Sequence, residues 1–101
     1  MYLNCDEEKI IGKFAKNFPK YDKENMLLLW ENGSSVLAKL DTCFEDENDY
    51  ENEKHEEFWS FSFTAILIFK KPPVFISENN GFLINYHNFP KEILVDGVKI
   101  N

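Results

Sequence analysis

The chain has 101 residues, 44% of them hydrophobic, and a formal net charge of −7. This length predicts one domain, residues 1–101, and the apolar content is high enough to fold it without a metal or a disulfide framework. The negative charge argues against nucleic acid and anionic membranes as partners and favours basic proteins or cations, and the absence of arginine further weakens a phosphate-binding role.

The first predicted element is an amphipathic helix over residues 5–17. Asn4 and Glu7 have the spacing of a capping box, which marks a helix N-terminus. Apolar residues then recur at helical spacing, and Pro19 ends the pattern. The repeating residues, which we expect to dock on the core, are Ile10, Ile11, Phe14 and Phe18.

The stretch MLLLWENGSSVLAKLDTCF predicts a β-hairpin. An apolar strand runs through Trp30, and a return strand passes through Val36, Ala38 and Leu40. The pair Asn32-Gly33 between them tolerates positive φ angles, so we expect a two-residue hairpin turn at that pair.

The stretch FWSFSFTAILIFK, residues 58–70, predicts a long strand because aromatic and small polar residues alternate. We expect one face to be buried along its first half and both faces along its second half. Pro72-Pro73 ends the strand. The face expected to point inward carries Trp59, Phe61, Phe63, Ala65, Leu67 and Phe69.

The remaining elements are short. VFI, residues 74–76, is expected to form a brief strand, ENNG a turn, and FLINYH another strand, and ILVDGVKI is expected to close the chain as a tight hairpin around Asp96-Gly97. One helix followed by five or six strands predicts an α+β domain, with an N-terminal helix and a bent antiparallel sheet or small open barrel. SH3-like and Sm-like barrels have this order of elements.

The most unusual stretch is FEDENDYENEKHEEF, residues 44–58. Residues 45–57 hold eight carboxylates against Lys54 alone, a net −7 that equals the charge of the whole chain, so the rest of the molecule is neutral. One interpretation is a solvated loop or frayed hairpin tip. Another is a docking surface for a basic protein. Aromatic residues at Phe44, Tyr50, Phe58 and Trp59 would then supply apolar anchors.

The same segment offers weaker chemical alternatives. Asp46, Asn48 and Glu57 stand at positions one, three and twelve of an EF-hand-like loop. Tyr50 and Glu51, however, occupy positions where that loop needs a ligand and a glycine. An exposed run of carboxylates also lacks the environmental asymmetry that separates the pKa values of an acid–base pair. We therefore expect neither a calcium site nor carboxylate catalysis.

The cysteines and histidines suggest a thiol nucleophile or a zinc site, formed from Cys43, His55 and His87 with or without Cys5. No known thiol-enzyme motif and no zinc-ligand spacing is present. We expect no catalytic residue, no metal and no cofactor. The opening MYLNC lacks a signal peptide, which predicts a reduced, cytoplasmic protein.

The stretch INYHNFPKEI is the other distinctive segment, and it reads as a strand edge followed by a turn. Tyr86, His87 and Phe89 could make a recognition patch beside the acidic segment. The partner-binding residues that we expect are Phe44, Glu45, Asp46, Glu47, Asp49, Tyr50, Glu51, Glu53, Glu56, Glu57, Tyr86 and His87.

The stretches WENGSSVLAKLDTCFEDEN, EEFWSFSF and INYHNFPKEI together resemble small acidic immunity proteins of bacterial polymorphic or contact-dependent toxin systems. The resemblance covers nearly the whole chain and rests on size, charge and pattern, so it assigns no functional residue. It implies a cytoplasmic protein without enzymatic activity that binds and blocks one cognate toxin domain, often a basic nuclease. Two alternatives stay open: a barrel-like structural or assembly module with an incidental acidic loop, and a phage anti-CRISPR inhibitor. Whether the chain forms a homo-oligomer is also open.

Overall fold

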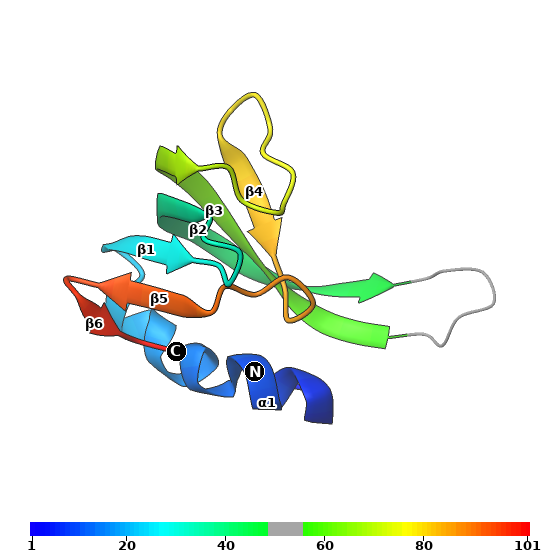
Figure 1. Cartoon of the computed structure of the whole chain (residues 1–101). Helices are drawn as coiled ribbons and strands as arrows, with labels where there is room; N and C mark the ends of the chain where they lie inside the picture. The colour runs from blue at the N-terminus through cyan, green and yellow to red at the C-terminus, as the bar shows by residue number, and fades with distance from the viewer. Residues whose placement is uncertain (49–55) are drawn as a thin grey trace.

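A computed structural model, which describes residues 1–48 and 56–101, consists of one helix followed by an antiparallel sheet (Figure 1). The sheet has six strands in the order β4-β3-β2-β1-β5-β6. The elements are α1 (Cys5–Asn17), the short 3-10 helix η1 (Phe18–Tyr21), β1 (Asn25–Leu29), β2 (Ser35–Asn48), β3 (Glu56–Lys70), β4 (Gly81–Ile84), β5 (Glu92–Val95) and β6 (Val98–Lys99).

The α+β class with an N-terminal helix is confirmed, and of the two expected forms the chain adopts the open sheet. β4 and β6 lie at opposite edges, so the sheet does not close into an SH3-like or Sm-like barrel. Among the described residues, no helix is long and apolar enough to cross a bilayer.

Helix α1 begins as its sequence predicts and covers one face of the sheet (Figure 1). The capping box is present, with Glu7 N–H donating to Asn4 Oδ1 and Asn4 N–H donating to Glu7 Oε1. Ile11 and Phe14 are buried, and the Phe14 ring packs edge-on against Phe61 at a centroid distance of 5.1 Å. Ile10, in contrast, is half exposed. The core therefore lies between α1 and the helix-facing side of the sheet.

The first hairpin is confirmed, but the expected two-residue turn is wrong. Trp30 N–H donates to Ser34 O, and Gly33 N–H donates to Trp30 O, so the loop contains the three residues 31–33. Gly33 has φ of +90°, whereas Asn32 stays at negative φ. A three-residue loop of this kind needs glycine only at its last position, where the backbone is left-handed.

The long strand β3 is confirmed, but the expected burial of its second half is wrong. Leu37 pairs with Leu67 and the next residue, Ala38, pairs with Ala65, so Ile66 is an extra residue on β3. Such a bulge reverses the alternation of faces, so Leu67 lies on the face opposite Ala65. Residues 66–69 are all exposed.

The segment after β3 forms no strand at residues 74–76, which corrects the expectation for VFI. Proline at 72 and 73 offers no N–H for a ladder, and Ser77 N–H is used within the next turn, where it donates to Gly81 O. That turn is the expected one, with Asn80 at φ of 65°. The final hairpin is also confirmed, with positive φ at Asp96 and Gly97.

Candidate functional site

The described part of the acidic segment is a strand pair and not a loop. Residues 45–48 of β2 pair with residues 56–59 of β3 in continuous antiparallel register. We call Phe44–Asn48 together with Glu56–Phe58 the acidic arm, and it projects beyond the rest of the sheet (Figure 1). The expected site residues Asp49, Tyr50, Glu51 and Glu53, and the thiol-partner candidate His55, lie outside the described residues.

Register divides the acidic arm into two faces. One face, continuous with the sheet surface away from α1, carries Phe44 opposite Ser60 and Asp46 opposite Phe58. Asp46 Oδ2 accepts a hydrogen bond of 3.1 Å from Ser60 Oγ. The other face carries Glu45, Glu47 and Glu57.

The face with three glutamates concentrates negative charge. Glu47 lies directly opposite Glu57, and both side chains are exposed. Like charges that face one another across a strand pair are destabilising. A cationic surface placed against this face would therefore gain electrostatic attraction.

The helix N-terminus anchors the base of the acidic arm. Glu7 is 1% exposed, and its Oε2 accepts a 2.6 Å hydrogen bond from Trp59 N–H while Oε1 accepts from Asn4 N–H. Asn4 Nδ2 donates to Glu57 O at 3.1 Å, and Trp59 Nε1 donates to Tyr2 O at 2.9 Å. The bonds to Trp59 N–H and Glu57 O satisfy two backbone groups of β3 beyond the end of β4 and hold the arm against the N-terminus of α1.

This anchoring role was missed by sequence reasoning. The Asn4/Glu7 spacing already explains Glu7 as a helix cap, and capping glutamates need no tertiary partner. The sequence contains no signal that the second carboxylate oxygen reaches a strand more than fifty residues away. Only the three-dimensional packing of α1 against β3 reveals the contact.

Aromatic side chains gather at the base of the acidic arm. Phe58 is buried, and its ring lies 6.4 Å from Tyr86 and 5.9 Å from His87 between centroids, both edge-on. β4 runs antiparallel to β3 with Ile84 opposite Phe61, so the turn after β4 returns toward the start of β3. Phe44 is 39% exposed on the same strand pair.

The turn that carries these rings is fixed by asparagine side chains. Asn85 Oδ1 accepts from His87 N–H, and Asn88 Oδ1 accepts from Asn85 N–H, both at 2.8 Å. The structure thus brings Tyr86 and His87 to the acidic arm. Phe89, which we grouped with them, instead packs against Phe14 in the core at 5.3 Å.

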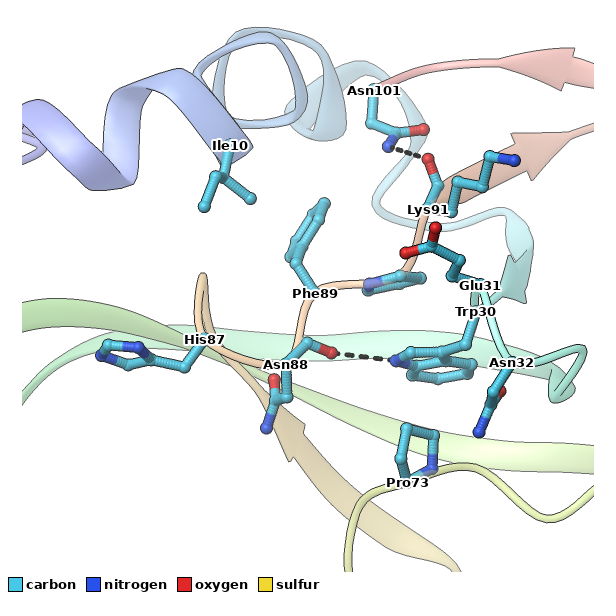
Figure 2. A pocket seen from close by; sticks show the side chains of 11 residues that line it. Ile10, Trp30, Glu31, Asn32, Pro73, His87, Asn88, Phe89, Lys91 and Asn101 are labelled. Carbon is cyan, nitrogen blue, oxygen red and sulfur yellow. Dashed lines mark hydrogen bonds between the residues drawn. The ribbon is translucent and has the colours of Figure 1, made fainter.

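An open depression of about 680 Å³ lies on the other side of this turn (Figure 2). Trp30 Nε1 donates to Asn88 O at 2.9 Å on one side of it, and Asn101 Nδ2 donates to Lys91 O at 3.1 Å on another. His87 also lines the depression, but Cys43 does not. The depression therefore does not bring a thiol and an imidazole together.

The position of Cys43 disfavours a role as a nucleophile. Cys43 lies opposite Phe61 on the core-facing side of the sheet, whereas His87 packs on Phe58 on the opposite face. Burial raises the pKa of the Cys43 thiol, and the N-terminal amine only partly opposes that rise. A raised pKa leaves less thiolate to react.

The acidic residues show no metal-binding arrangement in the part of the chain that the structure describes. No group of three or more histidine, cysteine or acidic side chains lies close enough to hold an ion there. Asp46 and Glu57, taken as EF-hand positions, lie on paired strands. An EF-hand loop needs flanking helices and a sharp turn.

Comparison with known proteins identifies one family. The family model described as "Cognate immunity protein YxxD" matches residues 9–101. This range includes the whole sheet, the acidic arm and the turn with Tyr86 and His87. No curated protein and no solved structure matches the chain. Because the family model spans nearly the entire sequence, the chain belongs to the family of YxxD cognate immunity proteins.

Proposed function

We propose that this immunity protein neutralises its cognate toxin by non-catalytic binding, with the acidic arm held against a basic surface of the toxin. Membership of the family supports a protein partner. The observation that carries the choice of surface is the strand pairing of the acidic segment, which displays Glu45, Glu47 and Glu57 on one face of a projecting arm. A cytoplasmic nuclease toxin fits this surface, because nucleases bind phosphate with basic clefts.

The anchoring of the arm favours tight binding. A disordered acidic segment would lose conformational entropy on binding, which lowers affinity. Here Glu7 and Asn4 already fix the β3 side of the arm through Trp59 N–H and Glu57 O. The ordering of those residues is therefore achieved in the free protein.

Aromatic residues extend the proposed contact to the opposite face of the arm, so that the toxin would contact the arm from both sides. Phe44 is partly exposed on the face with Asp46, and the rings of Tyr86 and His87 contact each other in a tilted arrangement at a centroid distance of 4.0 Å. Carboxylates raise the rate of encounter, whereas buried aromatic contacts slow dissociation. The two kinds of residue therefore predict different kinetic effects when they are replaced.

The test uses the cognate toxin domain and measures its association with the chain by stopped flow. The arm variant carries Glu45→Gln, Asp46→Asn, Glu47→Gln and Glu57→Gln. Its association rate at low salt should fall about tenfold or more, and its dependence on salt should flatten.

A matched control removes the same amount of charge far from the arm. It carries Asp22→Asn, Glu24→Gln, Glu78→Gln and Asp96→Asn, all at exposed positions. At about 0.15 M salt, where the Debye length is about 8 Å, the control should associate within about twofold of the wild-type rate, because charges farther than this from the contact are largely screened. Equal rates for the arm variant and the control would refute the proposed surface.

A further inference from the structure

The end of β3 opposite the acidic arm exposes an apolar run that the proposed toxin surface does not use. We call residues 66–70 the β3 strand end. Ile66, Leu67, Ile68 and Phe69 are 49%, 54%, 44% and 62% exposed. Four consecutive exposed apolar residues on a strand are a liability unless another surface covers them.

The backbone edge of the β3 strand end is open as well. β4 pairs only with residues 61–64 of β3, and Ala65 N–H donates to Asn80 O just beyond. In the next segment, residues 71–80, Ser77 N–H donates to Gly81 O and Asn80 N–H donates to Ser77 O, so these two amides are used within the turn before β4. No strand within the described ranges pairs with residues 66–70 on this side.

Two apolar rows cross the sheet and end at this open edge. On the face away from α1, directly paired residues form the row Leu94, Leu27, Leu37 and Leu67. On the face toward α1, the row is Ile93, Leu28, Val36 and Ile68. The first three members of the second row are fully buried, whereas Ile68 is not. One more strand at this edge would continue both rows.

We propose that the missing strand is the β3 strand end of a second copy of this chain, paired antiparallel about a twofold axis. With Ile68 on the axis, Leu67 of each copy faces Phe69 of the other, so the apolar run is self-complementary. Ile66 faces Lys70 of the second copy, which keeps the two Lys70 side chains at opposite ends of the pairing. An isologous contact of this kind closes with two copies and does not propagate.

Charge favours a second copy over the toxin at this edge. Lys70 and Lys71 follow the apolar run directly, and both are exposed. A basic toxin surface would be repelled there, whereas it would be attracted to the acidic arm. An anionic membrane is disfavoured by the net charge of −7.

The geometry also keeps the acidic arms apart. β3 runs from the acidic arm to the opposite end of the sheet (Figure 1). In an antiparallel pair the two arms point away from each other. From the rise of about 3.3 Å per residue along the two β3 strands, the arms lie on the order of 60 Å apart, which is several times the Debye length. Both arms would stay accessible to toxin.

The bulges limit the strength of this dimer. Ile66 and Phe69 each lie at a register shift on β3, and a bulged strand bends away from a long regular ladder. The pairing is therefore short, and we expect reversible association in the micromolar range that is typical of small interfaces.

The test is sedimentation velocity of the full chain between about 1 µM and about 500 µM, a range that brackets weak interfaces. Wild type should shift from monomer to dimer across this range. Phe69→Lys should remain monomeric throughout, because it places a charge opposite Leu67. The matched control Val98→Lys changes a residue that is 58% exposed on the other edge strand, β6, and should dimerise like wild type.

Amide exchange provides a second readout that does not depend on a substitution. Amides of residues 66–70 should exchange more slowly at high protein concentration, and those of β6 should not change. A wild-type chain that stays monomeric at every concentration would overturn the proposal. A dimer that Phe69→Lys leaves intact, or that Val98→Lys abolishes, would also overturn it. These outcomes are independent of toxin binding by the acidic arm.

Discussion

Replacement of Glu7 by glutamine tests how the acidic arm is anchored. Glu7 is buried, and each carboxylate oxygen accepts one backbone N–H, from Asn4 at 3.2 Å and from Trp59 at 2.6 Å. Glutamine keeps the shape but has a single acceptor oxygen, so its amide NH₂ must face one of the two donors. One partly buried N–H is then left without an acceptor.

The cost of that loss can be estimated. A buried polar group left unsatisfied costs about 1–3 kcal/mol, and bonds to charged acceptors lie at the upper end of the range. We therefore expect Glu7→Gln to lower the free energy of unfolding by about 2 kcal/mol, which corresponds to a fall in Tm of roughly 10 °C for a domain of this size.

The assay is thermal unfolding followed by circular dichroism, with Glu8→Gln as the control. Glu8 lies in the same helical turn but is exposed, so its variant removes the same charge from the helix N-terminus without a buried bond. The Trp59 amide should also exchange faster in Glu7→Gln. Two variants equal in stability within about 0.5 kcal/mol, the usual range for surface changes, would refute this account of the anchor.

Three further predictions concern separate parts of the molecule. Phe44→Ala, at a partly exposed position, should leave Tm within a few degrees of wild type but speed toxin dissociation about tenfold, as measured by surface plasmon resonance. An unchanged dissociation rate would show that Phe44 is not part of the toxin-binding surface. Gly97→Ala should lower the free energy of unfolding in urea by about 1 kcal/mol, because the backbone φ of Gly97 is +80° and the added Cβ meets no atom within 4 Å. An unchanged free energy of unfolding would contradict this explanation from backbone strain. Burial raises the pKa of the Cys43 thiol, so iodoacetamide should alkylate Cys43 more slowly than exposed Cys5 at pH 8, and its rate should increase with pH. Mass spectrometry would measure both rates, and equal rates for the two cysteines at pH 8 would count against the burial of Cys43.

Local signals in the sequence predicted the elements whose structure is set by neighbouring residues. The Asn4/Glu7 capping box fixed the start of α1, and Asp96-Gly97 predicted the final hairpin because both positions need left-handed backbone. The alternation from Trp59 to Ala65 likewise predicted the strand and its buried face. In each case a few adjacent side chains determine the backbone geometry.

Features that depend on pairing between distant strands were not predictable. The acidic residues Glu45–Glu47 have low strand propensity, yet β3 extends β2 through them by direct pairing. The bulge at Ile66 turns Leu67 to the other face, and nothing in the regular alternation marks it. The candidate site shows the same limit, because the contact of Tyr86 and His87 with Phe58 depends on how β4 returns along β3.

The central claim is that the acidic arm is where the toxin binds. Amide exchange of the free protein and of its complex with the cognate toxin tests this claim most directly, because it maps the contact without altering the chain. We predict slower exchange on complex formation at residues 44–47, 57–60 and 85–88, with residues 92–99 unchanged. Protection confined to β5 and β6, with the acidic arm unaffected, would contradict the account.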